Sequence, residues 1–132
     1  MIIIADATHY KEKEDLYINV RNAEGRVVSN DLLQLLPYVP VDCDIAFELR
    51  IRSDSLNLFT QYVLNRFGKK QLKILDVGCG NGWMSHRLYK LGHKLICIDL
   101  NMVELAQAEA VFGENANLQW MYANIMEDKI PY

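Results

Sequence analysis

Apolar residues follow a helical period in the middle of the chain. Between Ser53, which can serve as an N-cap, and Gly68, they recur at steps of three and four positions. Glycine at position 68 suits the left-handed residue that often ends a helix. The pattern therefore predicts a helix over residues 53–68. The residues in phase are Leu56, Phe59, Val63 and Phe67.

Three short apolar runs come after this helix, at residues 72–77, 94–100 and 118–123. The first two are apolar on both faces, which is typical of strands in a parallel sheet covered by helices. Residues 83–92 and 102–113 lie between the runs and predict helices that end in glycine. The order strand, helix, strand, helix, strand predicts an α/β fold, the Rossmann-like βαβαβ half of a doubly wound parallel sheet.

The first 52 residues follow a less regular pattern. Apolar and polar residues alternate on both sides of Ala23-Glu24-Gly25 within residues 16–29, which predicts a small hairpin. Residues 29–37 predict a short helix with Ser29 or Asn30 as N-cap, stopped by Pro37. We therefore divide the chain into an N-terminal segment, 1–52, and half of a larger domain, 53–132.

The first strand of such a half sheet, residues 72–77, is normally central and paired on both sides. Here it would keep an unpaired edge, which favours association with other chains. We expect this edge to be covered by Ile2–Ile4 or by another copy of the chain, a homo-oligomer. The interpretation that we favour is that the chain is the N-terminal, truncated part of a longer enzyme; the alternative is a complete small fold.

Composition narrows the classes of function only slightly. The net charge of −3 and a pI of about 5.6 supply no basic surface for nucleic acid, although an RNA substrate is not excluded. No apolar run approaches the roughly 20 residues that span a bilayer, and the N-terminus does not resemble a signal peptide. The three cysteines are unpaired in sequence, which indicates a cytoplasmic protein with reduced thiols. Zinc binding by Cys43 with His9 or His86 lacks the usual paired spacing, so we expect no metal.

Three of the seven glycines, Gly78, Gly80 and Gly82, follow the first strand at alternate positions. Glycine allows both the sharp turn into a helix and a close approach of the backbone to a ligand. Asp76 precedes the glycines, where its carboxylate could hold the loop or accept from an amino group of the ligand. Asp99 ends the next strand, 21 positions after Gly78, where an acid can bind both hydroxyls of a ribose.

Two nucleotide classes fit this loop poorly. A nicotinamide dinucleotide site wants a third glycine at position 83, which is Trp83 and would crowd the pyrophosphate. No lysine follows the glycines, which excludes a P-loop. The loop therefore favours an adenosine with a ribose and no pyrophosphate, and an NAD-dependent oxidoreductase is a distant alternative.

The segments ILDVGCGNG, ICIDLN and YANIMEDKIPY, in this order, resemble the first three motifs of the class I S-adenosylmethionine-dependent methyltransferases. The resemblance covers residues 72–132. It implies that S-adenosyl-L-methionine is the cofactor. The implied cofactor-binding residues are Asp76, Gly78, Gly80, Gly82, Asp99, Leu100, Met102, Asn124 and Ile125.

Each of these residues has an implied role. The glycines would lie beneath the methionine part, Asp76 would reach its amino group and Asp99 would bind the ribose. Leu100 and Met102 would pack on the adenine, although both also fit as ordinary core residues. Asn124 stands where an aspartate is common and keeps an acceptor for the adenine amino group. Ile125 would offer its backbone N–H.

The resemblance leaves the methyl acceptor unknown, with a small molecule favoured over nucleic acid. Residues that select and deprotonate the acceptor lie mostly after the third motif in this family, so no catalytic residue is named. A non-catalytic module that binds the cofactor or a partner is the alternative function. Arg50 and Arg52 could reach the cofactor carboxylate, whereas His86 is expected to be solvated on its helix.

Overall fold

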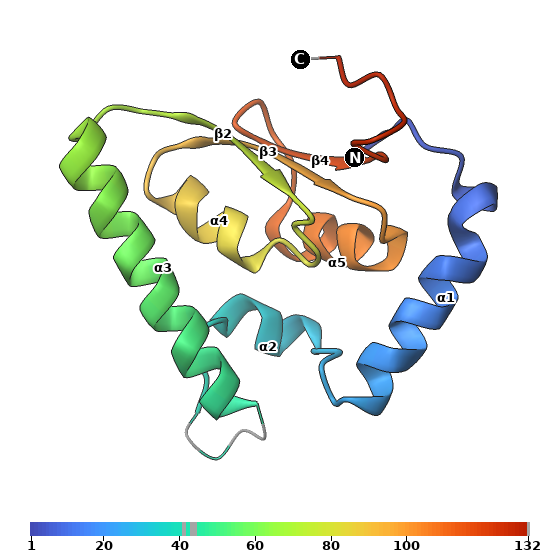
Figure 1. Ribbon diagram of the computed structural model, residues 1–132. Helices are drawn as coiled ribbons and strands as arrows, with labels where there is room; N and C mark the ends of the chain where they lie inside the picture. The colour runs from blue at the N-terminus through green and yellow to red at the C-terminus, as the bar shows by residue number, and fades with distance from the viewer. Residues whose placement is uncertain (41, 43–44, 132) are drawn as a thin grey trace.

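The computed structural model describes residues 1–40, 42 and 45–131, so Cys43 lies outside the described residues. Within these residues the strands form one parallel sheet in the order β1-β4-β3-β2 (Figure 1). The strands are β1 (Ile2–Ile3), β2 (Lys73–Val77), β3 (Lys94–Asp99) and β4 (Leu118–Tyr122). The helices are α1 (Ala7–Ala23), α2 (Asn30–Leu35), α3 (Ala46–Phe67), α4 (Trp83–Lys90) and α5 (Met102–Phe112). The expected βαβαβ half sheet is confirmed as β2-α4-β3-α5-β4.

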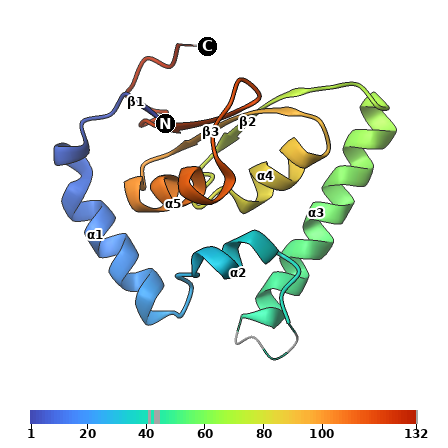
Figure 2. The ribbon, with the colours of Figure 1, turned by 180° about the vertical axis from the view of Figure 1, so that it is seen from behind.

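Helices α4 and α5 cover one face of the sheet, and α2 lies beneath them (Figures 1 and 2). The long helices α1 and α3 stand on opposite sides of this layer, so that they frame it. The main core forms between the sheet and α4 and α5. Its fully buried side chains include Leu95, Cys97, Leu105, Leu118, Trp120 and Tyr122.

The opposite face of the sheet is covered only in part. Ile98 and Met121 are buried there against Ile2, Ile4 and Ile130. Leu75 and Val77 of β2 are each 51% exposed, and no helix among the described residues lies on this face (Figures 1 and 2). Strand β2 is therefore apolar on both faces, but only one of its faces is covered by helices.

The hairpin expected over residues 16–29 is wrong, because α1 runs through Ala23. The Asp6 side chain accepts from the Thr8 backbone N–H at 2.9 Å and caps the helix. The residues that follow are rich in lysine and glutamate, which favour a helix, and this outweighs the short alternation that suggested strands. The short helix after it is confirmed, with Ser29 as N-cap accepting from the Leu32 N–H at 3.2 Å.

Helix α3 begins at Ala46, seven residues before the expected start at Ser53. Its buried residues Leu49, Leu56 and Val63 recur every seventh position, so the apolar stripe extends one repeat further back than we inferred. The helix ends as expected at Gly68, which has a φ of +63°. The expected domain boundary at residues 52 and 53 therefore falls inside a continuous helix.

Ile2–Ile4 do not cover the edge of β2. Ile2 and Ile3 pair in parallel with Met121 and Tyr122 of β4, at the opposite edge of the sheet. Ile2 and Ile4 pack there against Ile98 and Met121. The burial of this apolar surface stabilises the pairing of β1 with β4. Within the described residues, β2 keeps one unpaired edge.

Gly82 is required by packing beneath the turn into α4. Its φ is +69°, and a Cβ at this position would lie 2.3 Å from Cζ3 of Trp120. The Trp120 ring cannot retreat easily, because it is fully buried and its Nε1 donates to the Gly113 carbonyl at 2.7 Å. The loop can therefore pass over the Trp120 ring only if residue 82 has no side chain.

We predict that Gly82→Ala lowers the free energy of unfolding by about 2–5 kcal/mol, the combined cost of the left-handed backbone and overpacking. Gly25→Ala is the matched control, since Gly25 has a φ of +66° with no atom within 4 Å of a Cβ. It should lose only about 1–2 kcal/mol. Urea unfolding measures both, and equal losses would refute the packing role of Gly82.

Candidate functional site

The glycine loop and the carboxyl ends of β2 and β3 form the floor of a cleft, and α1 and α3 supply its sides. In open parallel sheets this end is where ligands bind. The residues that line the cleft are Tyr17, Arg21, Arg52, Asp76, Gly78, Cys79, Gly80, Asn81, Trp83, Met84, Asp99 and Glu104. The cleft thus brings Asp99 together with Asp76, Gly78 and Gly80, which precede it by 19 to 23 positions in the sequence.

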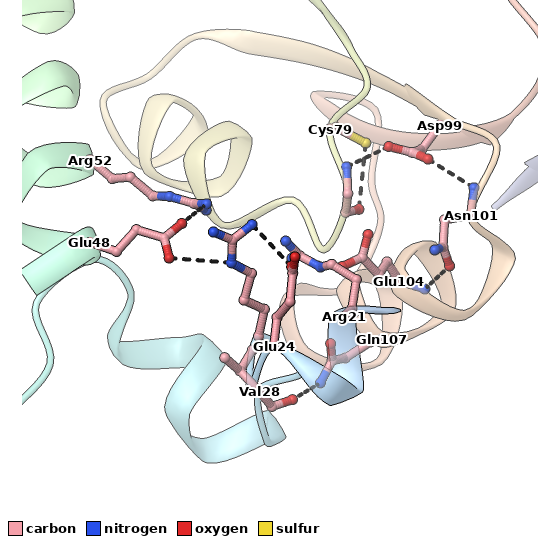
Figure 3. A network of polar contacts seen from close by, with 12 residues as sticks. Arg21, Glu24, Val28, Glu48, Arg52, Cys79, Asp99, Asn101, Glu104 and Gln107 are labelled. Atoms are coloured by element: carbon pink, nitrogen blue, oxygen red, sulfur yellow. Dashed lines mark hydrogen bonds and ion pairs between the residues drawn. The ribbon is translucent and has the colours of Figure 1, made fainter. Parts of the chain in front are cut away.

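Asp99 connects the loop to the next helix (Figure 3). One carboxylate oxygen accepts from the Gly80 N–H at 2.7 Å, and the other accepts from the Asn101 N–H at 2.8 Å. Each oxygen has a second lone pair for a ligand. The carboxylate therefore holds the loop and also presents acceptors at the cleft.

Asp76 and Gly78 lie at the other end of the glycine loop. The Asp76 carboxylate accepts from the Ser85 hydroxyl, which belongs to α4 and is fully buried. A Cβ on Gly78 would meet no atom within 4 Å, so this glycine faces the open cleft with a φ of +76°. Gly78, unlike Gly82, leaves its backbone accessible to a ligand.

A second hollow adjoins the first and shares Tyr17, Gly78 and Asp99 with it. It also contains Leu100 and Asn124, two of the residues expected around an adenine ring. Asn124 is engaged by its own surroundings: its Nδ2 donates to the Tyr10 hydroxyl at 3.0 Å, and its Oδ1 accepts from the Met126 N–H at 3.0 Å. The remaining lining residues are Tyr10, Lys13, Glu14, Asn101 and Glu127.

Three expected binding residues lie apart from this lining. Gly82 is buried against Trp120. Met102 is partly buried against the main core, which agrees with its alternative interpretation as a packing residue. Ile125 is 40% exposed beyond the end of β4. Roles for these three in binding stay predictions.

Helix α1 supplies residues of the candidate site that the sequence analysis missed. Tyr10, Tyr17 and Arg21 line the cleft or its adjoining hollow, although all three fell in the segment expected to be irregular or a hairpin. Their spacing of seven and four positions, with Glu14 between them, places them on one face of a helix. A test for helical period across residues 7–23 could have found this polar stripe.

Arg21 forms a buried ion pair beneath the loop. Its Nη2 lies 3.3 Å from Oε1 of Glu104, with side-chain exposures of 17% and 10%. Burial raises the pKa of the Glu104 carboxyl, and the Arg21 charge opposes this rise. Oε2 of Glu104 lies 3.1 Å from the position of a Cβ on Gly80. The pair therefore joins α1 to α5 directly under the glycine loop (Figure 3).

The two arginines expected near the cofactor carboxylate occupy different positions. Arg52 lines the cleft, whereas Arg50 is exposed elsewhere on α3. Among the described residues no cluster of three potential metal ligands is found, and no helix is long and apolar enough to cross a membrane. The zinc site considered for Cys43 depends on a residue outside the described ones.

His86 is not solvated as expected, because its ring stacks on Phe112 with centroids 4.1 Å apart. Burial lowers the pKa of His86, and the charges of Arg87 and Lys90 lower it further. The neutral ring is therefore the form that the folded chain prefers. This residue belongs to the packing between α4 and α5 rather than to the cleft.

We predict a pH-dependent stability from His86. Because its folded pKa lies below the unfolded value, its contribution is complete above about pH 6.5. The contribution is lost as the pH falls through the folded pKa. Urea unfolding at pH 7.5 and pH 5 should show a larger loss of stability for the unaltered chain than for His86→Phe, which keeps the stack without a titrating group. Equal losses would contradict this assignment.

Comparison with known proteins connects this cleft to a family. Residues 74–132 match the family model described as a methyltransferase domain. A protein of Geobacillus sp. (strain WCH70) that is named a methyltransferase is 36% identical over 77 residues, which are 56% of this chain and 31% of that protein. An uncharacterized methyltransferase of Mycobacterium tuberculosis (strain H37Rv) is 34% identical over 58 residues, 44% of this chain and 29% of that protein. The chain spans about a third of the length of these relatives.

Solved structures show the same fold at low sequence identity. The plantazolicin methyltransferase BpumL, in complex with a desmethylPZN analogue and SAH, aligns with a TM-score of 0.57 and 21% identity, over 95% of this chain and 40% of that chain. Magnesium protoporphyrin IX methyltransferase from Synechocystis PCC 6803, with bound SAH, aligns with a TM-score of 0.58 and 13% identity. That alignment covers 86% of this chain and 52% of the other.

Proposed function

We propose, since the chain belongs to the class I S-adenosylmethionine-dependent methyltransferases through residues 74–132, that its cleft binds S-adenosylmethionine for methyl transfer. The observation that carries the proposal is the convergence of Asp76, Gly78 and Asp99 on one cleft at the carboxyl ends of adjacent strands. The bound SAH and SAM of the structural neighbours support it.

The residues present fit this cofactor. Asp99 offers a lone pair on each oxygen for the two ribose hydroxyls, the contact that an acid at this position makes in dinucleotide-binding sites. Gly78 leaves space at the loop for the methionine part. Leu100 and Asn124 line the adjoining hollow, where the adenine would lie. Trp83 lines the cleft, where its ring would crowd a pyrophosphate.

The cofactor supplies a methyl group on a sulfonium that is already activated for displacement. The task of the protein is therefore mainly to hold donor and acceptor in line. Asp99 and the glycine loop would orient the donor, and Trp83 and α1 would limit the access of water. We assign no general base, because the residues that deprotonate the acceptor in this family lie mostly after the third motif.

Three finer proposals accompany this function. We favour a small-molecule acceptor, because the net charge of −3 offers no attraction to nucleic acid. The edge of β2 that is unpaired within the described residues supports association with a second copy. Cys79 and Cys97 are free thiols, which supports a cytoplasmic location.

We predict that Asp99→Asn weakens the binding of S-adenosylhomocysteine by about 10–100-fold, because a charged acceptor for the ribose is lost. Isothermal titration calorimetry on the 132-residue chain measures this Kd. Asp54→Asn, an exposed position on α3, is the control and should bind like the unaltered chain. Unchanged affinity in Asp99→Asn would overturn the ribose assignment. Absence of binding to the unaltered chain would overturn the proposed function.

A further inference from the structure

Charge is distributed unevenly along the chain. Residues 55–98 contain seven of the fourteen lysines and arginines but only one of the seventeen acidic residues, Asp76. This stretch therefore has a formal charge of +6. The remaining residues, with seven positive and sixteen negative side chains, have a charge of −9. The net charge of −3 is thus the sum of two oppositely charged parts.

The fold collects six of these seven cations where β2 and β3 begin, at the end of the sheet away from the cleft (Figure 1). Lys73 and Lys94 are register partners on the two strands. The Gln71 side chain donates to the Gly92 carbonyl at 2.8 Å, which joins the segment before β2 to the turn before β3. We call this surface the basic end. Its members are Arg66, Lys69, Lys70, Lys73, Lys90 and Lys94.

No carboxylate compensates the basic end within the part of the chain that the structure describes. None of the six side chains has a hydrogen bond or an ion pair with another described residue. Asp76 lies near the other end of β2, where it accepts from Ser85. Glu109 and Glu114 are already paired with the amino group of Met1. The basic end therefore presents its charge to the surroundings of the protein.

The fold itself explains only two of the six cations. Arg66 and Lys90 lie in the last turns of α3 and α4, where a positive charge is favourable to the helix dipole. Lys73 and Lys94, in contrast, lie side by side on neighbouring strands, about 4.8 Å apart. Like charges in this arrangement are destabilising. An anionic surface outside the chain would remove this repulsion.

Apolar side chains among the lysines indicate which kind of anion fits. Leu64, Phe67 and Leu91 are 53%, 42% and 55% exposed. Leu64 and Leu91 line one surface hollow together with Lys69 and Lys70. Surfaces that bind nucleic acid rely on arginine and on aromatic stacking, to which exposed leucines add nothing. Lysine is depleted in interfaces between proteins. Both alternatives therefore fit the basic end less well than a lipid surface.

Lysines interspersed with exposed leucine and phenylalanine are typical of proteins that bind an anionic bilayer. The ammonium groups meet the lipid phosphates, and the apolar side chains enter the boundary between headgroups and acyl chains. We propose that the basic end docks on a membrane surface that contains anionic phospholipids. Because the cleft lies at the other end of the sheet, docking leaves it accessible. The proposal goes beyond the proposed function and does not depend on it.

The test measures binding to sucrose-loaded vesicles by sedimentation. One set contains phosphatidylcholine alone, and the other contains equal parts of phosphatidylcholine and phosphatidylglycerol. The unaltered chain should bind the anionic set only. Raising the salt concentration from about 0.1 M to about 1 M should release it, because the Debye length falls to about 3 Å.

Lys69→Gln/Lys70→Gln should weaken binding to the anionic vesicles by about 25-fold, since each lysine near such a surface contributes a factor of about five. Both lysines are exposed, so the fold should be kept. Lys11→Gln/Lys129→Gln is the matched control, because it removes the same charge from exposed positions outside the basic end. Its binding should stay within about twofold of that of the unaltered chain.

Leu91→Gln tests the apolar contribution separately. It should weaken binding to anionic vesicles by about threefold or more, because a leucine no longer leaves water. A purely electrostatic partner would not register this change. The Kd for S-adenosylhomocysteine should stay unchanged in all these variants, since none of these residues lines the cleft. Failure of the proposed function would therefore leave this test intact.

Equal vesicle binding by Lys69→Gln/Lys70→Gln and the control pair would overturn the proposal. Equal binding of the unaltered chain to neutral and anionic vesicles, or no binding to either, would overturn it as well. Labelled polyuridylate and polyglutamate are the remaining probes. If one of them binds the basic end and the anionic vesicles do not, the surface belongs to nucleic acid or to an acidic protein, and the membrane proposal is wrong.

Discussion

The Asp99 carboxylate is the interaction on which the candidate site depends. It accepts the backbone N–H of Gly80 from the loop after β2 and that of Asn101 from the start of α5. Two segments that follow neighbouring strands are thereby held at one point. Charge-assisted hydrogen bonds of this kind are stronger than neutral ones. Because the same carboxylate faces the cleft, the group that shapes the loop is also the group best placed to recognise a ligand.

The glycine loop is also constrained by the side chains packed beneath it, in addition to its hydrogen bond with Asp99. Trp120 occupies the space that a side chain on residue 82 would need, and Glu104 lies close under Gly80. Gly78 alone of the three has open space around it. The three glycines therefore satisfy different requirements: Gly78 leaves room for a ligand, Gly80 for a buried carboxylate and Gly82 for an aromatic core residue.

Helix α1 is joined to the sheet layer through polar contacts more than through apolar packing, since Tyr10 is its one buried residue among those described. The Arg21–Glu104 pair and the bond from the Tyr122 hydroxyl to Glu14 join α1 to the sheet layer. Several apolar residues on the outer faces of α1 and α3 remain exposed, among them Leu16, Phe47 and Leu58. A helix fastened by a few buried polar bonds can change its position more readily than one packed into a core.

The sequence by itself determined the half sheet, the glycine loop and the acids around it, because strand and helix periods and the strand-to-helix turn are local properties of the chain. It did not determine α1, since the helical tendency of residues 7–23 and the alternation around residue 18 compete locally. The pairing of β1 with β4 and the positions of Tyr10 and Arg21 at the candidate site exist only in three dimensions. The tertiary structure also decided that Ile2 and Ile3 join β4 instead of β2, because the apolar surface of Ile98 and Met121 lies there.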